Sequence, residues 1–252
     1  MPSEIILKKM FALFRREISS FFSSLTGYVV IIVFLVMNGL FLWVFSGEFN
    51  IMESGYATLD SMFILAPWVF LFLVPAVTMR LFSDEKKTGT IELLFTRPLT
   101  DLQIILAKYF AGLVLVILAL LPTLIYYISV YNMGNPVGNI DSGGFWGSFM
   151  GLFFLAAVYV AIGLFTSALS DNQIVSFILG VLFCFMVFLG FDYLSSLWQS
   201  GGVQNFVDGL GISYHYNSMA RGVIDTRDVI YFLSVISIFI LFSKITMESR
   251  KW

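Results

Sequence analysis

Residues 144–168 read GFWGSFMGLFFLAAVYVAIGLFTSA, an apolar run without a single charged side chain. A helix needs about 20 such residues to cross the hydrocarbon core of a bilayer, so we expect this run to be a membrane span. Glycine, alanine and serine recur at positions 147, 151, 157, 161, 163 and 167, with Gly143 just before the run. Small residues let helices approach closely in lipid. We therefore expect this face to pack tightly within the bundle, with packing between protomers as the alternative.

Five similar runs flank this one, and together they predict six transmembrane helices. The six runs cover residues 27–45, 62–79, 103–128, 144–168, 173–197 and 229–247. The chain of 252 residues is 59% hydrophobic and 12% charged, about half the charge of a soluble domain. The sequence thus predicts an all-α integral membrane protein with a single transmembrane domain over residues 1–252. Cys184 is the only cysteine, which excludes a disulfide framework and a cysteine-based metal site.

The distribution of Lys and Arg predicts that both termini are cytoplasmic. Twelve of these residues lie before the first span, around the connection of spans two and three, or near the carboxyl end of the chain. The other two, Arg221 and Arg227, lie on the opposite side. Because basic loops stay in the cytoplasm, this bias fixes the orientation, and an even number of spans agrees with it.

Residues 4–22 are expected to form a separate helix on the cytoplasmic membrane surface. Apolar side chains recur at 7, 11, 14, 18 and 22, which places them on one helical face. The basic side chains lie on or beside the other face; they are Lys8, Lys9, Arg15 and Arg16. Such a helix binds an anionic leaflet. The alternative is an ordinary basic flank of the first span.

The longest predicted external segment is the loop 198–227. Val203, Phe206, Val207 and Leu210 share a helical face, which predicts a short amphipathic helix that dips back towards the membrane. A surface loop with a few apolar residues is the alternative.

Two ionisable residues near the external side could carry function. His215, the only histidine, has no Cys, Asp or Glu at ligand spacing, so we expect no metal site there. Asp192 lies near the outer end of span five, as either a polar group inside the membrane or the residue that ends the span at the wet interface.

The segment RLFSDEKKTGTIELLFTRP, residues 80–98, is the most charged interior stretch and joins spans two and three. Gly89 is expected to break the helix that continues from span two. Thr90 is then positioned to cap a short new helix, which Pro98 ends. Thr100 is expected to begin span three in a capping box with the residue three positions later, Gln103.

An apolar stripe lies on this short helix, formed by Ile91, Leu94 and Phe95. Glu92 falls in the first turn and Arg97 in the last, so each charge matches its end of the helix dipole. A stripe of this kind must be covered, either by neighbouring helices or by a partner protein. Prolines within spans two and three, at 67, 75 and 122, predict kinks because each removes one helical hydrogen bond.

This segment resembles the ABC-2 type transporter permeases. The likeness lies in residues 84–109, DEKKTGTIELLFTRPLTDLQIILAKY, where an acidic-basic run leads to Gly-Thr, an apolar-acidic turn, a Pro and a Lys entering span three. Residues 213–234, SYHYNSMARGVIDTRDVIYFLS, are similar to the segment before the last span of these permeases. The chain is most similar to the gliding-motility-associated permeases of the GldF type, followed by permeases of the copper-enzyme maturation type.

The resemblance implies that residues 89–97 are a coupling helix that docks on a separate ATPase, and that residues 4–22 are the elbow helix. The residues that it implies in docking are Gly89, Thr90, Ile91, Glu92, Leu94, Phe95 and Arg97. It also implies two copies of a cytoplasmic ABC ATPase, which bind ATP and Mg, and a second permease subunit, identical or different. If the chain is of the gliding type, the resemblance also implies a membrane partner protein with an extracytoplasmic domain. The implied location is the bacterial inner membrane, and no nucleic acid partner is expected.

ATP hydrolysis is expected to take place on another polypeptide, because the chain has no G-x-x-x-x-G-K-[ST] sequence to hold the phosphates. We expect neither catalytic residues nor a cofactor in this chain. The expected function is that of a permease for export or force coupling. The rivals are a structural subunit that anchors other machinery and a membrane-embedded enzyme, which would need paired polar groups inside the membrane.

Overall fold

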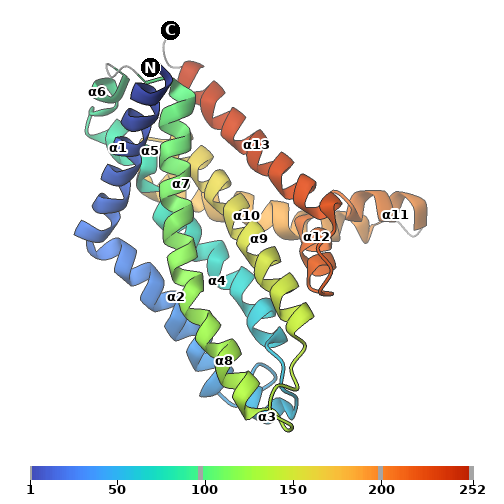
Figure 1. Cartoon of the computed structure of the whole chain (residues 1–252). Helices are drawn as coiled ribbons and strands as arrows, with labels where there is room; N and C mark the ends of the chain where they lie inside the picture. Colours follow the sequence, from blue (N-terminus) through green and yellow to red (C-terminus); the bar gives the residue numbers. More distant parts are fainter. Residues whose placement is uncertain (1, 96–98, 198–200, 250–252) are drawn as a thin grey trace.

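The computed structural model describes residues 2–95, 99–197 and 201–249, and every regular element within them is helical. Six of its helical segments are long and apolar enough to cross a membrane (Figure 1). They are α2 (Leu25–Trp43), α4 (Asp60–Thr78) with α5 (Arg80–Lys87), α7 (Asp101–Leu120) with η1 (Leu121–Thr123) and α8 (Leu124–Met133), α9 (Ser142–Leu169), α10 (Gln173–Ser195) and α13 (Thr226–Glu248). The predicted fold class and the six spans are confirmed. The third span is longer than predicted, because helix continues beyond the turn of 3-10 helix η1 as far as Met133.

Helix α9 forms the centre of the bundle, where it packs against α4, α7, α10, α12 and α13. Its apolar stretch is 78% buried, against 17% for α13 at the periphery. The small residues predicted to pack tightly do so within the chain: Ala157, Ala161 and Ser167 are buried. Gly163 lies so close to α4 that a Cβ atom there would come within 1.9 Å of the Thr78 hydroxyl oxygen. Gly143, the first residue of the predicted series, is exposed.

Two of the three prolines are accommodated in different ways. Pro122, where a kink was predicted, lies in η1, the turn of 3-10 helix within the third span. Pro67 lies inside α4 and has no N–H, so the Phe63 carbonyl loses its usual helical donor. The Tyr216 hydroxyl supplies the missing donor, at 2.6 Å from the Phe63 oxygen. A carbonyl freed inside a span is in this way satisfied by a neighbouring helix.

The external segment contains two helices where one was predicted. The predicted helix is α11 (Gly201–Asp208), which projects away from the bundle and buries none of its described residues (Figure 1). The second, α12 (Ile212–Met219), packs against α9, and Gly147 faces it so closely that a Cβ atom would lie 2.2 Å from the Met219 carbonyl oxygen. The sequence prediction did not include α12, although its buried residues Ile212, Tyr216 and Met219 have the i, i+4, i+7 spacing of one helical face. Another short helix, α3 (Ile51–Ser54), lies in the loop after α2.

Polar contacts join α12 to the last span. The His215 ring lies 2.7 Å from Asp228 through Nδ1 and 3.0 Å from the Gly209 carbonyl through Nε2. It stacks on the Tyr231 ring with 3.9 Å between centroids. His215 therefore holds the external helices to α13.

The amino-terminal helix α1 (Pro2–Ser23) is present as predicted, but its buried face differs from the apolar stripe read from the sequence. It packs along α7 and buries Leu13, Glu17 and Phe21, which are spaced four residues apart. Of the stripe expected to face the leaflet, Phe11 is 60% exposed, whereas Phe14, Ile18 and Phe22 are half-buried against the core. Glu17 lies at the centre of the buried face, where an ion pair satisfies it.

Candidate functional site

The connection between spans two and three lies at the same end of the bundle as both chain termini (Figure 1). Helix α5 continues from α4 after a turn at Met79, and a second short helix, α6 (Ile91–Phe95), follows it. Gly89 lies between them with φ of 71°, a left-handed conformation that favours glycine. The predicted helix break at Gly89 is therefore confirmed, and it lets the chain turn sharply into α6.

Helix α5 is fastened to the central helix α9 by hydrogen bonds at its first turn. The Ser167 hydroxyl oxygen accepts from the N–H groups of Phe82 at 2.9 Å and Ser83 at 3.1 Å. The same hydroxyl donates to the Met79 carbonyl at 2.9 Å. One serine of α9 thus satisfies two of the N–H groups that a helix start leaves without partners.

The last turns of α5 are fastened to the end of α9 and the start of α10. The Lys86 ammonium donates to the Ala168 carbonyl. The Gln173 amide donates to Asp84 Oδ1 at 2.8 Å. Contacts at both ends therefore hold α5 against the bundle, so that it forms a firm base for α6.

A group of four charged residues joins α5 to α1 and α7. We call this group, Arg16, Glu17, Glu85 and Lys108, the Lys108 cluster. The Lys108 ammonium lies 3.3 Å from Glu17 Oε1 and 3.0 Å from Glu85 Oε2, and 5.2 Å from the centre of the Phe82 ring. Arg16 Nη2 lies 2.7 Å from an oxygen of each of the same two carboxylates.

The Lys108 cluster is charge-balanced and lies mostly away from solvent. The Lys108 side chain is 1% exposed and the Glu17 side chain 10%, whereas Arg16 remains 47% exposed. Burial alone would lower the pKa of Arg16, but the hydrogen bonds and charges of Glu17 and Glu85 outweigh it and raise that pKa. A buried ammonium is tolerated in such a place only because charged partners surround it.

A cavity of about 600 Å³ lies beside the Lys108 cluster, between α1, α5 and α6. Its lining combines cluster residues with polar side chains of α5 and of the turn before α6, among them Arg80, Thr88 and Thr90. Arg80 donates to the Thr26 hydroxyl at the start of α2, at 2.7 Å. The cavity thus has α1 and the start of α2 on one side and the segment that carries α6 on the other, and Arg80 and the Lys108 cluster link the two sides.

The apolar stripe predicted for α6 is covered in part by the chain itself. Leu94 is 2% exposed and belongs to the core of the chain itself, and Ile91 is half-buried against that core. Among the described side chains of α6, the exposed apolar one is Leu93, at 66%, next to the exposed Glu92. Of the two expected ways to cover the stripe, neighbouring helices of the same chain therefore cover Leu94 fully and Ile91 in part. The Phe95 side chain and Arg97 lie outside the described residues.

Two caps were predicted for this segment. The Gln103 side chain accepts from the Thr100 N–H at 3.0 Å, as a capping box requires. Thr90 lies at the start of α6, where its carbonyl accepts from the Leu94 N–H at 3.3 Å. Its hydroxyl lies 2.9 Å from the Thr88 hydroxyl and donates to the Glu85 carbonyl at 3.4 Å, so Thr90 also contacts the end of α5.

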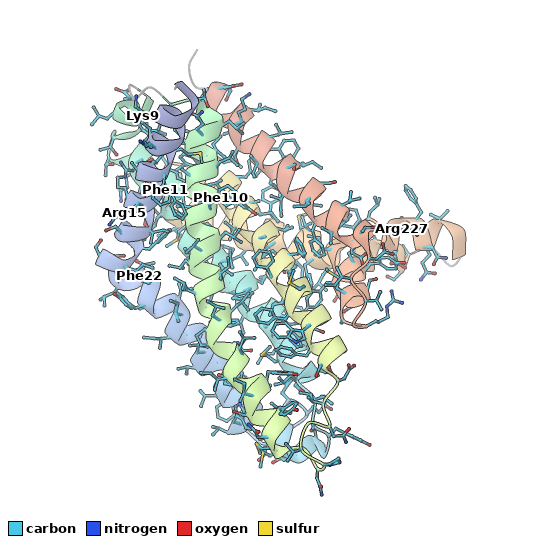
Figure 2. All side chains as sticks on the ribbon, in the orientation of Figure 1. Lys9, Phe11, Arg15, Phe22, Phe110 and Arg227 are labelled. Atoms are coloured by element: carbon cyan, nitrogen blue, oxygen red, sulfur yellow. The ribbon has the colours of Figure 1, made fainter. Side chains whose placement is uncertain are left out.

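The predicted basic residues of α1 separate into two groups. Lys8, Lys9 and Arg15 are exposed, and Figure 2 shows Lys9 and Arg15 on the outside of α1. Arg16 is instead part of the Lys108 cluster, where it pairs with Glu17 and Glu85. The sequence reading missed the cluster because its members are far apart in the chain; a Lys in an apolar run at 108 and a Glu on the apolar side of α1 were the available signals.

Asp192 lies far from this site, in the last turns of α10. Its two carboxylate oxygens accept from the Ser213 hydroxyl at 2.5 and 2.6 Å. This residue therefore fastens the start of α12 to α10. Among the described residues, no group of three or more His, Cys, Asp or Glu side chains is arranged to hold a metal ion.

Comparison with known proteins identifies the transmembrane region. The family described as ABC-2 family transporter protein matches residues 49–200, which is more than half of the chain and includes α4 to α10. No individual curated protein matches the chain. Six apolar spans and this match agree, and the chain belongs to the ABC-2 family of transporter membrane proteins.

Proposed function

We propose that α6, held out by α5, is the docking element through which this permease subunit is driven by a separate ATPase. Membership of the family implies an ABC ATPase partner. The observation that carries the proposal is the contrast between the two sides of the α5–α6 segment. One side is fastened to α1, α7 and α9, while Glu92 and Leu93 on α6 are exposed at the end of the molecule.

A short helix with an exposed leucine and an adjacent carboxylate suits insertion into a groove with a basic rim. Leu93 would fill the groove and Glu92 would pair at the rim, as in other helix-in-groove contacts. Gly89 and Thr90 shape the turn before α6, while Ile91 and Leu94 attach it to the chain. The docking role that the resemblance gave to Leu94 therefore passes to Leu93, and Phe95 and Arg97 keep their implied roles as part of the proposal.

Motion of the ATPase would pass through α5 to two parts of the bundle. Ser167 links α5 to the central helix α9, and Lys108 links it to α7. Closure of two ATPase subunits would then move two permease subunits and switch access between the sides of the membrane. In this arrangement both termini and α6 are cytoplasmic, and the membrane is the bacterial inner membrane.

Reversal of the α6 charge tests the docking role. Glu92→Arg should leave membrane insertion unchanged and abolish both binding of the purified ATPase and the stimulation of its ATP hydrolysis. Glu48→Arg makes the same charge change at an exposed position in the loop after α2, so it should behave as wild type. Wild-type ATPase binding and stimulation by Glu92→Arg would remove α6 as the docking element.

We further propose that the complex is of the gliding-motility type. This assignment rests on the resemblance of the chain as a whole to GldF-type permeases, whereas residues 84–109 and 213–234 carry its likeness to ABC-2 permeases in general. An ATPase subunit and a large partner with an extracytoplasmic domain should then be encoded beside this chain. Reconstituted complex that hydrolyses ATP without moving any candidate solute, and that still binds such a partner, would favour the structural anchor over the transporter.

A further inference from the structure

We infer that Lys108 is a positioning residue that makes α1 move together with α5, so that each ATPase stroke reaches the membrane-surface helix as well as the spans. The inference rests on the proposed docking of the ATPase at α6. It concerns a different step, namely what α5 carries with it when it moves.

The first support is the position of the ammonium between two helices that the chain places far apart. Glu17 is on α1 and Glu85 is on α5, and α2, α3 and α4 separate them in the sequence. Lys108 on α7 is within 3.3 Å of both carboxylates. One buried charge therefore contacts both helices at once.

The second support is the imbalance that its removal would create. The cluster contains two positive and two negative side chains, and without Lys108 both carboxylates would depend on Arg16. Arg16 is 47% exposed, so water screens its charge more strongly than that of Lys108. Glu17 and Glu85 would then repel each other across the α1–α5 contact. The two helices would separate along the 600 Å³ cavity that already lies between them.

The third support is what α1 presents on its outer side. Lys8, Lys9 and Arg15 are exposed there, and they suit an anionic lipid surface. A shift of α5 that carries α1 would move these charges relative to the leaflet. Through Lys108, motion that the ATPase causes in α5 would thereby also move α1 at the membrane surface.

Distances between spin labels separate this role from a merely structural one. Cys184 is the only cysteine and is buried, so new cysteines can be labelled selectively. Labels at Ser19 and Lys87, both exposed, report the separation of α1 and α5, and labels at Ser19 and Glu48 report motion of α1 relative to the opposite end. The complex with its ATPase is measured in lipid nanodiscs, without nucleotide and with trapped ATP.

In the otherwise wild-type chain, trapped ATP should change the Ser19–Glu48 distance and leave the Ser19–Lys87 distance unchanged. Lys108→Met should allow ATP to change the Ser19–Lys87 distance, because α5 then moves without α1. Lys108→Arg retains the charge and should restore the wild-type pattern. If Lys108→Met fails to insert, Glu17→Gln serves instead, since it removes the ion pair of Lys108 with α1 and keeps the pair with Glu85; the Arg16–Glu17 pair that it also removes lies within α1.

The inference is overturned if trapped ATP changes the Ser19–Lys87 distance in the wild-type background, or if Lys108→Met leaves it as constant as wild type. If the cluster only stabilises the fold, Lys108→Met should lower the protein yield while the Ser19–Lys87 distance stays constant. That result would also overturn the inference. ATP-dependent changes that persist in Glu92→Arg would overturn the docking proposal alone. No ATP-dependent change at either label pair would overturn both.

Discussion

Tyr216→Phe should destabilise the bundle, although it removes a single oxygen atom. The Tyr216 hydroxyl donates to the Phe63 carbonyl at 2.6 Å, and Pro67 cannot provide the usual helical N–H for this carbonyl. The tyrosine is 5% exposed, so water cannot replace the lost donor. Leaving a buried acceptor without a partner costs about 1–3 kcal/mol. For a chain of this size that corresponds to a fall in Tm of about 2–12 °C.

The assay is thermal unfolding of the purified protein in detergent, and Tyr214→Phe is the matched control. Tyr214 is the neighbouring tyrosine on α12 but is 53% exposed, so its variant should unfold at the wild-type temperature. Burial raises the pKa of the Tyr216 hydroxyl above its ordinary value, so this group stays protonated. The difference in Tm should therefore be the same at about pH 6 and about pH 9.

Pro67→Ala provides the decisive cross-check, because alanine returns an N–H to position 67. In that background Tyr216→Phe should cost less than it does in the wild type, and the difference is the coupling between the two sites. Equal costs in the two backgrounds, or a Tyr216→Phe variant as stable as Tyr214→Phe, would refute the assignment of Tyr216 as the substitute donor.

Three further predictions concern the packing of α9, the start of α5 and the external helices. Gly163→Ala places a Cβ atom 1.9 Å from the Thr78 hydroxyl oxygen and should lower the free energy of unfolding by about 1–3 kcal/mol in the same assay. The control is Gly190→Ala, whose Cβ would lie 4.0 Å from the nearest atom, Met186 Cβ, and which should not lower stability. Ser167→Ala leaves two N–H groups of α5 without their acceptor and should reduce stimulation of the ATPase while ATPase binding persists; unchanged stimulation would count against the α5–α9 link. His215→Ala removes the contacts to Asp228 and Gly209 and should speed amide hydrogen exchange across α12 by about 10- to 100-fold, with α9 unaffected; unchanged exchange would show that α12 is held without His215.

The spans could be predicted from the sequence because the bilayer imposes one rule on every segment. A run of about 20 apolar residues is a local property, and each predicted run corresponds to a helix. Helix ends with a local chemical signature were also predictable, such as the turn at Gly89 and the capping pair of Thr100 and Gln103.

The candidate site was less predictable, because its contacts are not local. Lys108 contacts Glu17 and Glu85, and nothing in the neighbouring residues of any of the three identifies the others. The choice between Leu93 and Leu94 as the exposed side chain of α6 depends on which face the rest of the chain covers. A helical stripe gives the relative directions of side chains but not the direction of the core, which only tertiary packing decides.

The bond between Tyr216 and Phe63 has a consequence for biosynthesis. The donor lies 153 residues after its acceptor, so the second span enters the membrane long before its partner has been translated. Until residue 216 leaves the ribosome, the Phe63 carbonyl must remain unsatisfied or borrow a temporary donor. Final assembly of the membrane domain is therefore a late, post-insertional event. In a nascent chain truncated before this residue, the second span would be inserted but would lack the Tyr216 donor. This span would then be exposed to quality-control proteases.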